Sequence, residues 1–154
     1  MSDLAAGEAA TPADALLGQA MADYRADPAR GDFLLHYACT QAADPLPLYR
    51  VITKFYNRQR RFDQAQDFAR RALAEAGRQC GLPEDPATWR RDHLPAWDTA
   101  PASQALLGLK AMAFIALRRQ DQELAARYLS LLSALDPEDG SGASVISALA
   151  ESLN

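Results

Sequence analysis

The sequence contains few of the residues that form β-sheets. Only two valines and three isoleucines occur among its 154 residues. Strands favour β-branched side chains, which pack well on a pleated surface. In their place the chain has 32 alanines and 21 leucines, and both residue types cost little free energy in an α-helix. We therefore predict an all-α protein, with the length of one ordinary domain.

Residues that carry chemistry are also scarce. The two cysteines, Cys39 and Cys80, are too few for a disulfide framework and show no metal-ligand spacing with His36 or His93. Nucleophile elbows, phosphate-binding glycine loops and zinc-binding histidine pairs are missing from the sequence. We predict no catalytic residue, no metal site and no cofactor, hence no enzyme. A weaker alternative is a small enzyme or metal carrier that uses Cys80 and His93.

Long apolar runs are missing as well. No run approaches the roughly 20 residues that span a bilayer, and the acidic first residues lack the pattern of a signal peptide. We expect a cytoplasmic protein that does not contact membranes. The chain has 14 arginines but only two lysines. Together with the many alanines, this ratio is typical of a GC-rich genome, and we expect a bacterial source.

Charge is distributed unevenly along the chain. The net charge is −4 and the isoelectric point is near 5.1, which argues against nucleic acid as the main partner. Residues 1–32 carry a charge of −4 and residues 120–154 a charge of −5, whereas residues 33–119 carry +5. The direction in which the basic side chains of the middle segment point is therefore the central functional question.

Turn and cap residues divide the chain into helices. Residues 1–10 are small and polar, so we predict that they are disordered, and that residues 11–154 form a single helical domain. The inserted segment at about 80–103 holds four prolines and both tryptophans, and the pattern leaves open a short helix over 85–93 or a long loop. Predicted helices start near Thr11 and Gly31 and then cover about 46–58, 62–79, 103–119, 121–135 and 143–153. In the helix from Gly31, Phe33 and Tyr37 belong to the expected apolar stripe.

Two of the predicted helix pairs resemble each other. Setting Ala65 against Ala125 aligns Tyr49 with Leu109 and Ile52 with Met112. This spacing resembles the tetratricopeptide repeat (TPR), a 34-residue helix pair. Counting from Leu46, the family's landmark positions hold Tyr49, Ile52, Tyr56, Phe62, Ala65 and Ala72; counting from Leu106, they hold Leu109, Met112, Ala113, Ala125 and the closing Leu135, Asp136 and Pro137.

The chain departs from the repeat in three respects. The usual glycine at unit position 8 is Thr53 or Ala113, and Leu132 replaces a small residue in the second unit. The two units start 60 residues apart, so about 26 residues are inserted between them. Residues 14–45 would make a third, degenerate unit. The resemblance implies antiparallel helix hairpins stacked as a short right-handed solenoid with a polar C-terminal capping helix. A generic helical bundle is the alternative.

The resemblance also implies a binding groove. In the family, ligand contacts come mainly from the first helix of each unit. Residues 50, 54, 57 and 58 share one helix face whatever the family, because their spacing matches the helical repeat. The predicted groove residues are Arg50, Lys54, Asn57, Arg58, Lys110, Phe114, Leu117 and Arg118. Such a set suits an acidic segment or a C-terminal carboxylate.

We therefore expect a non-catalytic adaptor or assembly chaperone that binds an acidic protein or peptide partner. Trp89 and Trp97 either contact that partner at the edge of the groove or clamp the inserted segment onto the helices. Three alternatives stay open. The basic residues simply face solvent, or an acidic end of the chain folds over the groove, or the protein is a structural oligomerisation module that forms a homodimer through its tryptophan-containing insertion or its end helices.

Overall fold

The computed structural model describes residues 11–152, and over this range the chain is helical without a strand. The all-α prediction is therefore confirmed for the described part of the chain. The disorder predicted for residues 1–10 lies outside the described residues. The α-helices are α2 (Pro12–Ala22), α3 (Pro28–Thr40), α4 (Leu46–Arg58), α5 (Phe62–Cys80), α6 (Ala102–Arg118), α7 (Gln122–Leu135) and α8 (Ala143–Ser152), and the 3-10 helices are η1 (Pro86–Thr88) and η2 (Arg91–His93). Between residues 11 and 152, no helix has both the length and the apolar character needed to cross a bilayer.

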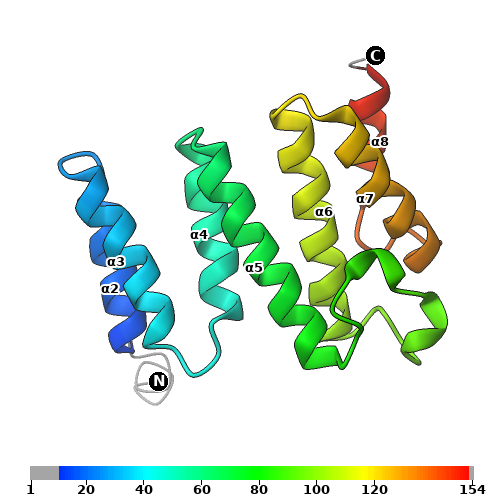
Figure 1. The fold of residues 1–154 in the computed structure, drawn as a ribbon, viewed down its shortest axis with the longest axis horizontal. Helices are drawn as coiled ribbons and strands as arrows, with labels where there is room; N and C mark the ends of the chain where they lie inside the picture. Colours follow the sequence, from blue (N-terminus) through cyan, green and yellow to red (C-terminus); the bar gives the residue numbers. More distant parts are fainter. Residues whose placement is uncertain (1–10, 153–154) are drawn as a thin grey trace, which may run out of the picture.

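Consecutive helices pack as hairpins that follow one another across the molecule (Figure 1). α2 lies against α3, α4 against α5, and α6 against α7, while α8 lies at the far end beside α6 and α7. α5 also packs extensively along α6, whereas α2 and α3 pack mainly on each other. The inserted segment folds near one end of α5 and α6 (Figure 1).

The first helix boundaries show how local sequence starts each helix. The Thr11 side chain accepts a hydrogen bond from the Asp14 backbone N–H at 3.1 Å, and the Asp14 carboxylate accepts one from the Thr11 N–H at 3.3 Å. This capping box confirms the predicted start of α2. α3 begins at Pro28, three residues before the predicted start, because Asp27 caps the helix and proline suits its first turn.

The face that α3 buries also differs from the prediction. Phe33 and Tyr37 are 66% and 45% exposed, and their rings stack with centroids 6.0 Å apart. The residues of α3 that are buried are Gly31, Leu35 and Ala38. The expected apolar stripe of Phe33, Leu34, Tyr37 and Ala38 was therefore wrong for the two aromatic rings, whereas Ala38 is buried and Leu34 packs against the core.

Alanine and glycine set the close packing of the remaining helices. Ala65, Ala72, Ala113 and Ala125 are all buried, as expected for points of close helix approach. At Gly108 on α6, a Cβ atom would lie 3.0 Å from Leu73 Cδ1 and 3.3 Å from Leu73 Cα on α5. A larger residue at position 108 would therefore push α6 away from α5.

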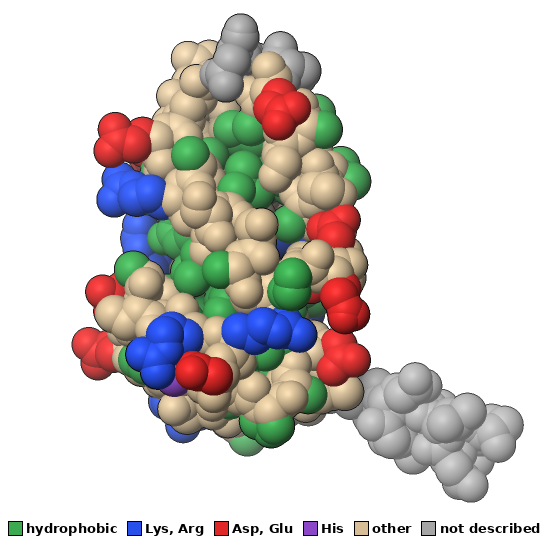
Figure 2. Space-filling view, turned by 90° about the vertical axis from the view of Figure 1, so that its right-hand side faces the viewer, with side chains coloured by type: hydrophobic (Ala, Val, Ile, Leu, Met, Phe, Trp, Pro, Cys, Tyr) green, Lys and Arg blue, Asp and Glu red, His purple; other side chains and the backbone are tan. Residues whose placement is uncertain are grey.

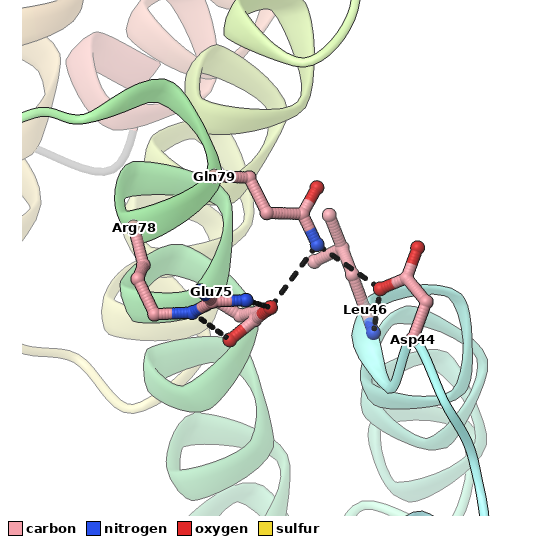
Figure 3. Close-up of polar contacts among 5 residues, drawn as sticks. All are labelled: Asp44, Leu46, Glu75, Arg78 and Gln79. Carbon is pink, nitrogen blue, oxygen red and sulfur yellow. Dashed lines mark hydrogen bonds and ion pairs between the residues drawn. The ribbon is translucent and has the colours of Figure 1, made fainter.

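A polar contact joins the start of α4 to the end of α5 (Figure 3). Asp44 Oδ1 accepts hydrogen bonds from the Leu46 N–H at 3.2 Å and from Gln79 Nε2 at 3.0 Å. Gln79 Nε2 also donates to Glu75 Oε2 at 3.1 Å. The Arg78 guanidinium donates to Glu75 and holds the pKa of that carboxyl below its usual value. These bonds fix the first turn of α4, the helix that carries four of the eight predicted groove residues.

The two tryptophans attach the inserted segment to the helices. Trp89 and Trp97 are 4% and 5% exposed, and their ring centroids lie 6.5 Å apart. Trp89 Nε1 donates to the Pro83 carbonyl at 2.7 Å, and Trp97 Nε1 donates to the Arg91 carbonyl at 2.8 Å. The segment contains two 3-10 turns rather than one helix over 85–93. Both rings are therefore buried in the packing of the inserted segment, and Trp97 also lines a cavity of about 500 Å³ beside the start of α6.

Candidate binding groove

Two adjoining cavities run along α4 where it faces α6. The first has a volume of about 410 Å³ and is lined by Arg50, Thr53, Lys54, Asn57, Ala69, Ala72, Gln104, Leu107, Gly108, Lys110, Ala111, Phe114 and Ile146. The second is more open, has a volume of about 400 Å³, and is lined by Lys54, Asn57, Arg58, Arg60, Phe114 and Arg118. Lys54, Asn57 and Phe114 line both cavities. We call the continuous hollow formed by both cavities the groove.

The structure brings together seven of the eight predicted groove residues. Those that line the groove are Arg50, Lys54, Asn57, Arg58, Lys110, Phe114 and Arg118. Leu117 does not line it: its side chain is 7% exposed and packs in a core cluster with Ala125 and Ile146. The side chain lies in this cluster because α7 and α8 cover that side of α6.

Other lining residues escaped the sequence analysis. Ile146 lies on α8, nearly ninety residues after α4, and no sequence pattern links the two helices. Gln104 was missed because it precedes the first unit position of the second predicted repeat. Arg60 was interpreted as part of a polar turn, yet its guanidinium borders the second cavity. The helical period of α6 would have found Gln104, which stands about one turn before Gly108.

All charged side chains that line the groove are basic. They are Arg50, Lys54, Arg58, Arg60, Lys110 and Arg118. None of the six forms an ion pair with a carboxylate of the described residues. Outside the groove, eight arginines do form such ion pairs: Arg30, Arg61, Arg70, Arg71, Arg78, Arg90, Arg119 and Arg127. An acidic molecule therefore keeps a concave surface of uncompensated positive charge, which attracts anions.

Internal contacts hold four of these six cations. Arg50 donates a hydrogen bond to Gln104 Oε1 across the groove, and Lys110 Nζ donates to the Ser141 carbonyl at 2.9 Å. The Arg118 guanidinium lies 4.8 Å from the Phe62 ring centroid and 5.6 Å from that of Phe114, both within the range of a cation–π contact. Arg60 likewise lies over the Phe62 ring, at 5.8 Å.

The two remaining cations are open to a ligand. Lys54 and Arg58 are exposed and make no hydrogen bond, ion pair or ring contact within residues 11–152. They stand one turn apart on α4, so one anionic group can approach both. These two side chains are the groove charges most available for pairing.

Asn57 places an unpaired polar atom between the two cavities. Its Oδ1 atom is buried and accepts no hydrogen bond from the described residues. Leaving such an acceptor unpaired costs about 1–3 kcal/mol. A ligand that donates an N–H or O–H to this oxygen would recover part of that free energy.

Groups suited to catalysis lie outside the groove. Burial raises the pKa of the Cys39 and Cys80 thiols, which lowers the fraction of reactive thiolate at neutral pH. The His36 ring packs on Phe68 at 4.8 Å, and His93 Nδ1 accepts a hydrogen bond from the Arg90 N–H at 3.0 Å. The described residues hold no group of three histidine, cysteine or carboxylate side chains placed to bind a metal ion.

The C-terminal end of the molecule presents a second surface. On α8, Val145 is 62% exposed and Leu149 is 45% exposed, although a polar cap was expected there. Figure 2 looks onto this end, where hydrophobic side chains run along the centre and acidic side chains lie at both edges. This surface is apolar where the groove is cationic, so the two suit different contacts.

Comparison with known proteins identifies no relative of this chain. No protein-family model, no curated protein and no solved structure matches the chain significantly. The function is therefore inferred from the geometry and the charge of the groove.

Proposed function

We propose that this protein is a non-catalytic adaptor or assembly chaperone that binds an acidic peptide segment of a partner protein in the groove. The observation that carries the proposal is the charge of the groove: six basic side chains line it, and none has a carboxylate partner within residues 11–152. Elsewhere on the molecule, eight arginines are paired. A concave cationic surface with an apolar floor fits an acidic segment or a C-terminal carboxylate.

The proposal includes a short right-handed TPR-like solenoid in a bacterial cytoplasm. Two features support the architecture. The helices form hairpins packed side by side, and the groove is lined chiefly by α4 and α6, which are the first helices of the two proposed units. The basic residues that the resemblance selects on those helices face a common hollow.

Charged and apolar contacts would contribute differently to ligand binding. Pairs between exposed charges contribute only about 0.2–1 kcal/mol each. The cations would therefore steer the ligand and set its register, while burial of apolar surface would supply more of the affinity. Steering by exposed cations also makes association sensitive to salt.

The test replaces the two open cations. We expect the double variant Lys54→Glu/Arg58→Glu to bind a fluorescein-labelled octaglutamate peptide at least tenfold more weakly than the unaltered protein, by fluorescence anisotropy. Its binding should also respond less to a rise from 50 to 300 mM salt, the two conditions chosen so that screening differs strongly. Affinity purification from the native cell with both proteins as bait would identify the partner that the variant loses.

The matched control changes charge equally outside the groove. Arg90 and Arg127 are 68% and 69% exposed and pair with carboxylates on other surfaces. The variant Arg90→Glu/Arg127→Glu should bind the peptide within twofold of the unaltered protein. Unchanged binding by the groove variant, or equal losses in both variants, would sink the proposal. Tighter binding of an RNA oligonucleotide than of the peptide would point to nucleic acid instead.

A second candidate function is self-association through the C-terminal end. The exposed apolar side chains of Val145 and Leu149 favour it. Static light scattering would show a concentration-independent dimer that Val145→Glu dissociates. Because Trp97 is buried, its replacement would disturb the inserted segment and is a poor test. A monomer at all concentrations would remove this candidate.

A further inference from the structure

We infer that the groove recognises two features of its ligand at once: a large apolar side chain seated in the first cavity, and an acidic group about three residues away, held at the Lys54 and Arg58 end. This inference rests on the proposed function, because it specifies which acidic peptides the groove selects. It follows from the shape of the first cavity, the spacing along α6 and the unpaired atom of Asn57.

The first cavity is apolar away from its basic rim. Its walls include Ala72 on α5, Leu107 and Ala111 on α6, and Ile146 on α8. Its volume of about 410 Å³ exceeds that of any single aliphatic or aromatic side chain. Beside the cavity, α5 and α6 approach closely at Gly108, where a Cβ atom would crowd Leu73 at 3.0 Å. An apolar side chain buried there would be the main anchor of the ligand.

Spacing along α6 relates this anchor site to the second cavity, which Lys54 and Arg58 line. From Ala111, which lines the first cavity, to Arg118, which lines the second, the chain advances seven residues along α6. At 1.5 Å per residue this separation is roughly 10 Å. An extended peptide advances about 3.3–3.6 Å per residue, so the anchor and the acidic group lie about three residues apart.

Asn57 favours a peptide over other amphipathic acids. Its buried, unpaired Oδ1 atom lies where the two cavities join. An extended peptide that crosses this point brings backbone N–H groups, which can donate to the oxygen. A fatty acid offers an apolar tail and a carboxylate but no donor there. The six cations are also spread along both cavities, beyond what a single carboxylate would use.

The experiment begins with selection from a phage-displayed library of random dodecapeptides on the full-length protein. We expect enrichment of sequences in which a large apolar residue lies two to four positions from a pair of acidic residues. Labelled versions of the selected peptides would then be measured by fluorescence anisotropy. Replacing the apolar residue of the peptide by serine should weaken binding at least tenfold.

Two protein variants separate the anchor cavity from the rest of the surface. Ala111→Leu should fill the cavity and weaken binding of the selected peptides at least tenfold. Ala74→Leu adds the same side chain at an exposed position of α5 that lines neither cavity, and it should stay within twofold of the unaltered protein. If Ala111→Leu fails to fold by circular dichroism, the serine-substituted peptides decide the question on the unaltered protein.

Each outcome distinguishes the inference from the proposed function. Selected acidic peptides that show no apolar preference and bind Ala111→Leu unchanged would overturn the inference while leaving the proposed function in place. Selection without enrichment of acidic residues would overturn both. Displacement of the labelled peptide by dodecanoate, with tighter binding of the fatty acid than of any selected peptide, would replace the peptide by a lipid-like ligand.

Discussion

Gly77 packs so closely against the inserted segment that even a methyl side chain would collide with it. A Cβ atom at this position of α5 would lie 2.8 Å from Cζ2 of Trp89. The absence of a side chain thus lets the indole ring lie on the helix backbone, with Trp97 beside it. At the scale of one residue, this contact helps to position the inserted segment, together with the hydrogen bond from Arg91 to the Leu135 carbonyl at 2.8 Å.

Substitution of Gly77 by alanine should therefore destabilise the protein. Alanine favours a helix over glycine by up to about 1 kcal/mol, so a gain would be expected if space allowed. We expect Gly77→Ala instead to lower the melting temperature and shift tryptophan fluorescence to longer wavelength as Trp89 is displaced. The matched control is Gly18→Ala on α2, where nothing lies within 4 Å of the added Cβ. That variant should gain about 0.5–1 kcal/mol, and a gain in both would contradict the role of Gly77.

The open groove cations were predictable at the residue scale, and Leu117 was not. Residues 50, 54, 57 and 58 share a face because the helical period is local and independent of the tertiary fold. Leu117 was assigned to the groove from a family position alone. Its burial depends on α7 and α8, which contact α6 from far along the chain.

At the scale of elements, one polar cluster joins the α2–α3 hairpin to α4 and α5. Asp32 Oδ1 accepts hydrogen bonds from the hydroxyls of Tyr24 at 3.0 Å and Tyr56 at 2.5 Å. Arg61 donates to the Tyr24 hydroxyl at 2.6 Å and lies 3.7 Å from Asp32 Oδ2. The Tyr24 ring also packs edge-on against Phe55, with centroids 5.1 Å apart. Replacement of Asp32 would leave two tyrosine hydroxyls without their acceptor.

This cluster predicts a loss of stability at alkaline pH. Burial, and then the hydrogen bond to Asp32, raise the pKa of Tyr56 above its ordinary value near 10. Because the pKa is higher in the folded state, the stabilisation is complete below pH 10 and is lost as the pH rises above it. The free energy of unfolding, measured with urea between pH 8 and pH 11, should fall above pH 10 by up to about 1.4 kcal/mol per pH unit for this tyrosine.

The variant Tyr56→Phe isolates this contribution. It should be less stable than the unaltered protein at pH 8, by about 1 kcal/mol, because it lacks one hydrogen bond. Above pH 10 its stability should fall less steeply, although Tyr24, whose pKa is also raised by burial, remains. Parallel curves for the two proteins would exclude Tyr56 as the titrating group.

At the scale of the molecule, contacts between hairpins are uneven. α5 packs along both α4 and α6, whereas α2 and α3 touch α4 far less. In a linear array of hairpins, each unit is stabilised mainly by its neighbours, so a weakly coupled end unit opens first. The groove lies between α4 and α6, which places it in the more tightly coupled part of the array.

Hydrogen exchange should report this gradient. We expect the backbone amides of α2 and α3 to exchange at least tenfold faster than those of α5 and α6 in native-state mass spectrometry. Asp32→Ala should widen the difference, because it breaks the polar cluster that holds α2 and α3 against α4. Uniform protection across all four helices would show that the hairpins open as one unit.

Charge is also segregated across the whole molecule. The groove carries six cations without a carboxylate partner among the described residues, while acidic side chains lie at the edges of the C-terminal end (Figure 2). The net charge of −4 conceals this separation. A partner with an acidic segment would be repelled by most of the surface and attracted to the groove, which favours a single mode of binding.

The amino-acid sequence by itself determined the helical class, most helix boundaries and the shared face of Arg50, Lys54 and Arg58. These features depend on composition, caps and the helical period, all of which act over a few residues. Only the tertiary structure decided that α4 and α6 face one hollow, that Ile146 closes it and that both tryptophans are buried. Those features depend on contacts between residues far apart in the chain. The sizes of the side chains and the distances between packed helices determine which of these residues come into contact.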